Sequence, residues 1–307
     1  MPKQEKNMKR KIIKQANQAY TITLPIEWVR KNNISEKSEV DLSIEGRSII
    51  INSQNNVSGG KVKIDFSGMD ITTVYRYLGA LYAKGIDEVE ITSKEDISSK
   101  IISALNYFIG YALVSQEGNK YIVKDLGGEK QSDLDEIFKR VFQIILLFFE
   151  SAVNDIFGKQ EETIESLKSR DKEVNKFCLF LQRAINKMSY PDPINGRALF
   201  TYSYALEKIG DEIERMWRTN IKYDIKKSPA LKKLVENSYE GLAKAFDFHF
   251  QFNSSRIGAI YSTREKVRNE SLKLKGLNGN TFRFVRQAVK IVEDAADLSH
   301  LTLIMKL

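Results

Sequence analysis

Carboxylates at helical spacing are the first feature of this chain that suggests chemistry. Glu207, Asp211 and Glu214 lie four and seven residues apart within residues 204–217. Residues at these spacings project from one face of a helix, so the three side chains converge, and no Lys or Arg is expected between them on that face. Such a cluster is repulsive unless it binds a cation, whereas a single pair of this kind is usually a solvated helix face.

The same arrangement occurs again near the C-terminus. Glu293 and Asp297 are four residues apart, and His300 takes the position of Glu214, so each matched pair is separated by 86 residues. A constant offset predicts an internal repeat of one structural unit. Carboxylates with one imidazole are ligands that suit iron, manganese, zinc or magnesium, so both motifs are candidate metal sites.

Hydrophobic periodicity indicates the elements that position these motifs. Leu206, Ile209, Ile213 and Trp217 recur every three or four residues, which predicts an amphipathic helix that carries the acids on its second face. His249 and the aromatic residues around it are expected to pack in a core. The same periodicity predicts six long helices, at about 132–157, 161–188, 195–222, 231–254, 255–274 and 281–306.

The segments L-E-K-I-G-D at 206–211 and V-E-D-A-A-D at 292–297 resemble the paired E-x-x-x-D signatures of PhoU, a phosphate-uptake regulator made of two three-helix bundles. The resemblance covers roughly residues 131–307, as repeats of about 131–225 and 228–307. It implies clusters of divalent or ferric metal ions between the helices, and a phosphate transporter or a regulatory protein as partner. Further acids from each middle helix are also implied. Asp171 and Glu173 stand there in the first bundle, Asn175 replaces a carboxylate, and the second middle helix is basic.

The N-terminus is basic, with six Lys or Arg and one acid in residues 1–14. This composition fits either a solvated tail or an arm that contacts nucleic-acid phosphates. Strands are expected at 10–15 and 20–24, a helix from Pro25 to the two asparagines at 32 and 33, and a hairpin at 40–44 and 48–51.

This order, with the core L-P-I-E-W at 24–28, resembles the swapped-hairpin DNA-binding domain of AbrB, SpoVT and MazE over about residues 8–53. The resemblance implies a homodimer whose hairpins interdigitate into a β-barrel, because about 45 residues cannot bury a sufficient core alone. It also implies DNA as a partner. The amides of Asn17 and Gln18 either reach base edges or fill a polar loop. The basic candidates for DNA contact are Arg10, Lys11, Lys14, Arg30 and Lys31.

Residues 61–126 form a third region. Alternating strand and helix patterns, with helices at 71–83 and 97–114, predict a small βαβαβ domain after a linker at 52–60. The region contains no phosphate-binding glycine motif. The expected fold is therefore multidomain α+β, with domains at 1–53, 61–126 and 131–307. In archaeal regulators that combine an AbrB-like domain with a PhoU-like domain, a segment that resembles residues 61–126 connects the two.

Composition describes a soluble protein, with 42% hydrophobic and 29% charged residues and a net charge of +8. The N-terminus is too polar for a signal peptide, and the longest apolar run, 141–149, is far shorter than the roughly 20 residues of a membrane span. The single cysteine, Cys178, lies in an apolar helical run and rules out a disulfide framework within the chain. We expect a cytoplasmic protein without a membrane span.

Three functions follow from these patterns. The first is a DNA-binding transcriptional regulator of phosphate uptake and homeostasis, whose PhoU-like part senses or relays a signal through metal. The second is an adaptor that docks a transporter or a signalling kinase, with the N-terminal domain as a dimeriser. The third, a carboxylate metalloenzyme such as a phosphatase, is disfavoured because no nucleophile or general base accompanies the motifs. We expect no enzyme.

Overall fold

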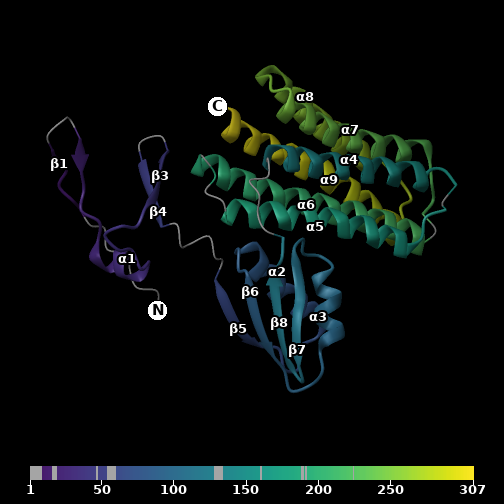
Figure 1. The fold of residues 1–307 in the computed structure, drawn as a ribbon. Helices are drawn as coiled ribbons and strands as arrows, with labels where there is room; N and C mark the ends of the chain where they lie inside the picture. Colours follow the sequence, from purple (N-terminus) through teal and green to yellow (C-terminus); the bar gives the residue numbers. More distant parts are fainter. Residues whose placement is uncertain are drawn as a thin grey trace. The chain divides into compact units, whose positions relative to one another are not determined.

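The computed structural model describes residues 9–15, 19–45, 48–53, 60–127, 134–159, 161–187, 190, 192–223 and 225–307. The chain divides into an N-terminal unit, residues 1–58, and a C-terminal unit, residues 59–307. The first contains short strands and a short helix, and the second contains a four-stranded sheet followed by long helices (Figure 1). The predicted multidomain α+β class, with a small β region ahead of a mostly helical one, is confirmed.

The N-terminal unit consists of two hairpins with a helix between them. Its first hairpin is shorter than predicted, and Lys14 pairs with Tyr20 beside the turn. The hairpins form separate two-stranded antiparallel sheets, and the described residues of the single chain contain no closed barrel. The dimeric barrel stays a prediction. The elements are β1 (Ile13–Lys14), β2 (Tyr20–Thr21), α1 (Ile26–Lys31), β3 (Val40–Glu45) and β4 (Ser48–Ser53).

Helix α1 begins and ends where the sequence predicted. Pro25 precedes it with a φ of −63°, the value that its ring imposes and that suits a helix start. Asn32 follows the last turn, and its side-chain amide donates to the carbonyl of Trp28 at 2.8 Å. Asn33 then takes a φ of 51°, in the left-handed region that Asn tolerates, which stops the helix.

The C-terminal unit begins with an α/β part. Its sheet has the order β5-β6-β8-β7, with β5 parallel to β6 and the other neighbours antiparallel. Val89 and Ile91 face a core that α2 and α3 complete, whereas Glu88 and Glu90 on the other face pair with lysines. The elements are β5 (Lys61–Asp65), α2 (Ile71–Ala83), β6 (Glu88–Thr92), α3 (Ser98–Leu105), β7 (Tyr111–Glu117) and β8 (Lys120–Asp125).

The prediction of one helix over 97–114 was wrong. Helix α3 ends at Leu105, and β7 begins at Tyr111, so this sheet has four strands where three were predicted. Gly110, with a φ of +88°, lies in the turn between α3 and β7 in a conformation that other residues rarely adopt. The run after it pairs with β8 as an antiparallel strand, so tertiary pairing overrides its helical periodicity.

Six long helices follow and repeat along the chain. Asp192 and Asn278 cap α6 and α9 by accepting backbone hydrogen bonds, and Lys187 and Lys273 end α5 and α8. Both pairs are 86 residues apart, the offset of the acidic motifs. The helices are α4 (Leu134–Ile156), α5 (Ile164–Lys187), α6 (Pro193–Lys222), α7 (Pro229–Phe250), α8 (Ile257–Lys273) and α9 (Gly279–Lys306).

The two trios of helices share one apolar core. Helix α6 packs along α9, and α4 packs on α7, so residues of both trios join a single buried cluster. Leu206 and Ile213 of α6 belong to it together with Ile291 and Leu298 of α9. The predicted apolar stripe of α6 is therefore buried, and its acidic face is turned away from this core.

Candidate functional site

The basic candidates of the N-terminal unit lie on its surface. Arg10 and Lys11 precede β1, and Lys14 lies in it; Arg30 and Lys31 form the last turn of α1. All five are exposed. Asn17 and Gln18 lie outside the described residues.

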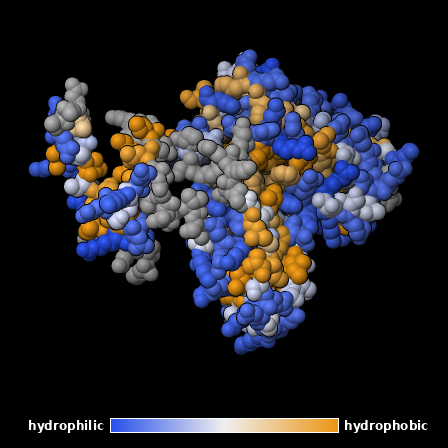
Figure 2. All heavy atoms as spheres, in the orientation of Figure 1, coloured by the Kyte–Doolittle hydropathy of each residue, from blue (hydrophilic) through white to orange (hydrophobic). Residues whose placement is uncertain are grey.

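Apolar side chains of the same unit are exposed as well. Ile44 is 80% exposed and Ile49 is 68% exposed, and Asn32 is the one buried residue among the described side chains of this unit. Figure 2 shows hydrophobic residues on the surface of this unit. The unit thus lacks a core of its own within its described part, as a half of a larger fold would. Its exposed large apolar residues are Ile12, Ile13, Tyr20, Ile22, Ile26, Leu42, Ile44 and Ile49.

The first acidic motif lies on α6 at a point where α5 packs closely against it. Gly210, inside the motif, makes this approach possible, because a Cβ atom there would lie 3.0 Å from the Cγ1 atom of Val174. Glu207 and Asp211 are half-buried, and Glu214 is buried. Burial raises the pKa of Glu214 despite the opposing effect of Arg218.

Cations from the same helix reach these acids, which corrects the expectation that none lies among them. Lys208 Nζ is 3.0 Å from a Glu207 oxygen and 3.2 Å from an Asp211 oxygen. Arg215 Nη2 lies 3.1 Å from Asp211, and Arg218 Nη2 lies 3.3 Å from Glu214 Oε2. Long side chains bend over the helix from its flanks, so spacing alone does not predict which charges meet.

Asp171 of α5 joins the cluster from the opposite helix. Burial, followed by the charges of Asp211, Glu214 and Glu207, raises the pKa of Asp171 to about 7. Its Oδ2 atom accepts a hydrogen bond of 3.1 Å from Asn175 Nδ2. The Oδ1 atoms of both residues are buried without a hydrogen-bond partner. Two unmet acceptors therefore remain beside a group of like charges, a costly arrangement for a protein interior.

A cavity of about 500 Å³ opens over this cluster, between the α/β part and the helices. No local pattern predicts its other wall, because residues of α2 and α3 reach α6 only through tertiary packing. The lining residues with polar groups or rings that matter here are Tyr75, Arg76, Tyr107, Lys172, Asn175, Glu207 and Asp211.

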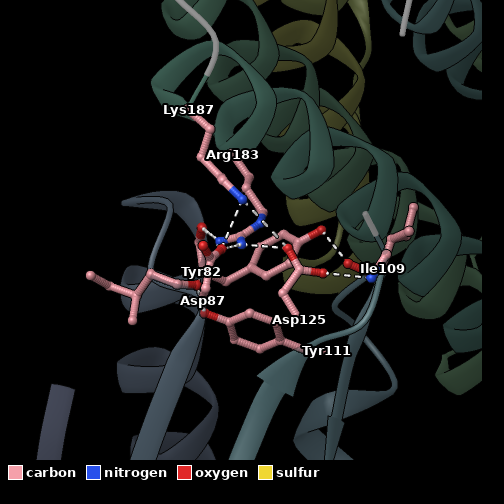
Figure 3. A network of polar contacts seen from close by, with 9 residues as sticks. Tyr82, Asp87, Ile109, Tyr111, Asp125, Arg183 and Lys187 are labelled. Atoms are coloured by element: carbon pink, nitrogen blue, oxygen red, sulfur yellow. Dashed lines mark hydrogen bonds and ion pairs between the residues drawn. The ribbon is translucent and has the colours of Figure 1, made fainter. Parts of the chain in front are cut away.

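Arg183 fixes the α/β part to α5 beside this cavity (Figure 3). Its guanidinium is buried, donates to the carbonyls of Tyr82 and Ile86, and lies 2.6 Å from carboxylate oxygens of both Asp87 and Asp125. Lys187 adds a 2.8 Å ion pair with Asp87. The planar fork of Arg satisfies four acceptors at once, so this contact has one defined geometry.

The second acidic motif is divided between two surroundings. Glu293 is held by Arg268 of the basic middle helix, at 2.7 Å. Asp297 and His300 are exposed and line a separate cavity of about 580 Å³ with Asp294. The two motifs share their spacing but do not form equivalent sites.

The candidate metal ligands lie in these two motifs and at Asp171. Within the parts of the chain that the structure describes, no group of three or more His, Cys, Asp or Glu side chains is arranged to hold a metal ion. In the second motif, Arg268 pairs with Glu293, and Asp297 and His300 line a cavity together with Asp294. Beside the first motif, the Oδ1 atoms of Asp171 and Asn175 have no hydrogen-bond partner, but the carboxylates of the motif itself already pair with Lys and Arg side chains. Metal binding stays a prediction.

Comparison with known proteins bears on the N-terminal unit. Residues 13–57 match the family described as antidote–toxin recognition MazE, a bacterial antitoxin. This confirms the predicted MazE/AbrB-like domain, a type that usually binds DNA and dimerises. No curated protein matches the chain. The PhoU resemblance of the helices stays a prediction. None of the helices in the described ranges is long and apolar enough to cross a membrane.

Proposed function

We propose that this chain is a DNA-binding transcriptional regulator that acts as a dimer through its N-terminal unit. The observation that carries the proposal is the MazE-type match over residues 13–57, on a unit whose basic side chains and apolar side chains are both exposed. The basic residues supply contacts to DNA phosphates, and a second copy covers the apolar ones.

The dimer supplies the core that one copy lacks. An exposed Ile or Leu gains roughly 1.5–3 kcal/mol when it is fully buried, so interdigitated hairpins that bury Leu42, Ile44 and Ile49 from two chains gain several such contributions. A dimer also brings two sets of Lys14 and Arg30 against one duplex. Affinity for DNA then depends strongly on salt, because each phosphate contact releases a counterion.

The helical part supplies the signal in this proposal. Its two acidic motifs support a relationship to PhoU, and phosphate uptake is the process that such a regulator controls. The buried acceptors of Asp171 and Asn175 support a cation at the first motif. Its binding would change how the DNA-binding halves are presented, which is a coupling between two distinct sites.

The first experiment measures retention of the full chain on random-sequence double-stranded DNA as NaCl is raised. Replacing Lys11 and Lys14 together with Ala should weaken binding at every sequence and reduce the salt slope by about 1 for each lost phosphate contact. The control is Lys159→Ala, an exposed lysine of the helical part. Absence of salt-dependent retention in the wild-type chain would overturn the proposal and favour the adaptor.

A second experiment tests the dimer by sedimentation. Ile44→Asp or Ile49→Asp should convert the dimer to a monomer and reduce DNA retention, because a carboxylate cannot be buried between the hairpins without a partner. Ile102→Asp is the matched control, an exposed Ile on α3 of the other unit. A wild-type monomer, or a dimer indifferent to both N-terminal substitutions, would contradict the dimeric arrangement.

A further inference from the structure

The cavity beside the first acidic motif has two unlike walls. Helices α5 and α6 contribute Lys172, Asn175, Glu207 and Asp211, of which all but Lys172 carry acceptor oxygens. Helix α2 and the segment after α3 contribute the rings of Tyr75 and Tyr107. A volume of about 500 Å³ falls within the range of small-molecule sites, and sites of this kind occur where two structural parts meet.

The unmet groups of the acceptor wall specify the kind of ligand. Asn175 is 8% exposed, lines the cavity, and has no hydrogen-bond partner at Oδ1. Its Nδ2 donates to Asp171, so the carbonyl oxygen is the atom of this side chain that still needs a hydrogen-bond donor. Asp171 Oδ1 also has no partner. A ligand that completes this wall must donate hydrogen bonds, and the adjoining carboxylates favour a positive charge.

The aromatic wall also accepts cations. The rings of Tyr75 and Tyr107 are 4.8 Å apart. Lys172 Nζ lies 5.1 Å from the Tyr107 ring centre, and the Arg76 guanidinium carbon lies 5.7 Å from that of Tyr75. Both rings therefore already serve as cation–π acceptors, and apolar ring surface suits the methylene groups of an organic cation. A bare metal ion makes no use of such a wall.

The two walls are held in place without a ligand. Helix α2 carries Tyr75 at the cavity and Tyr82 in the Arg183 network, and α5 carries Asn175 and Arg183. Arg183 of α5 bonds to groups of α2 and of the sheet, so contacts that need no ligand join the elements of the two walls. A preformed site loses little free energy on ordering when it binds.

We propose that this cavity binds a small organic cation with a primary ammonium group. The ammonium donates to Asn175 Oδ1 and to the carboxylates of Glu207 and Asp211, and its alkyl part lies on Tyr75 and Tyr107. A carboxylate accepts several hydrogen bonds, so Glu207 and Asp211 serve this ligand while they pair with Lys208. The inference rests on the proposed function, whose cation site it assigns to a chemical class other than metal.

The test is calorimetric titration of the full chain with 1,4-diaminobutane at constant ionic strength. The wild-type chain should bind it, and Asn175→Leu and Tyr107→Leu should each weaken binding at least tenfold. Asp297→Asn, in the second motif, should bind as the wild type does. Tyr107 is only partly buried, so its variant keeps the test valid if Asn175→Leu does not fold.

Three outcomes would overturn the inference. They are absence of diamine binding, binding unaffected by both variants, and tight binding of Mn²⁺ or Zn²⁺ that the diamine does not reduce. Retention on DNA without diamine is measured in parallel. Intact retention with any of these outcomes refutes the ammonium site alone, whereas loss of retention in the wild type refutes the proposed regulator.

Discussion

The two helical repeats carry acids at the same spacing, yet their surroundings differ. In the first, Asp171 and Asn175 face the acidic stripe with buried acceptors that have no partner, and the α/β part closes a cavity over it. In the second, Arg268 faces Glu293, and Asp297 and His300 line a cavity whose described lining comes from α6, α8 and α9. The comparison teaches that a motif places charges on a face, and that the facing helix decides what they do.

The largest expected difference in stability between the two repeats comes from Arg183, which attaches the first repeat to the α/β part. Arg183→Met removes a guanidinium that is 1% exposed and leaves Asp87 and Asp125 without it, so the free energy of unfolding should fall by about 3–5 kcal/mol in urea denaturation. Asn269 lies 86 residues later, on the exposed side of α8. Asn269→Ala should change stability by no more than about 0.5 kcal/mol. An equal loss of stability in both variants would show that the two repeats do not differ in this respect.

The stability of the packing between the two repeats, where His249 of α7 contacts α4 and α6, should depend on pH. Burial lowers the pKa of His249 to about 4, and it packs among aromatic rings of α4 and α6. The unfolded chain binds a proton at this histidine more readily, so stability should fall as the pH drops from 7 towards 4, by up to about 3 kcal/mol. In urea denaturation between pH 7 and pH 4, His249→Gln should lose less stability than the wild-type chain. His300→Gln, at an exposed position of α9, is the control.

The acidic cluster of the first repeat should be stabilised by losing a charge. Asp171→Asn removes a half-buried carboxylate from the field of Glu207, Asp211 and Glu214, so the free energy of unfolding should rise by about 1–2 kcal/mol at pH 8. Binding of 1,4-diaminobutane should weaken in the same variant. Such opposed effects are expected where function retains an unfavourable group. A loss of stability would show that the cluster is an ordinary ion-pair network.

Neutralising a carboxylate of the second repeat should have the smallest effect on stability, and it should lower stability instead of raising it. Glu293→Gln leaves Arg268 without its carboxylate at a partly exposed position. The thermal midpoint should fall by no more than about 2 °C, because exposed ion pairs contribute little. A rise like that expected for Asp171→Asn would mean that both motifs are strained, and the comparison between the repeats would fail.

Local patterns predicted much of this protein. The helix periods, the stop at Asn32 and Asn33, and the MazE-like domain are all encoded within short stretches of sequence. The acids of α6 were found in the same way, because a helical period projects residues four apart onto one face. Strand β7 was missed, since its residues fit a helical period and only pairing with β8 decides between the two.

Tertiary structure alone decided which groups meet. Arg183 contacts Tyr82 and Asp87, which lie 101 and 96 residues earlier in the chain, and no local pattern marks it as the residue that joins two parts. Tyr75 and Tyr107 face Asn175 for the same reason. Spacing determines the direction of a side chain on its own helix, whereas the partner it meets depends on how the elements pack. The sequence alone therefore predicted the acidic stripe, whereas the cavity beside it and the cations that pair with it are set by tertiary packing.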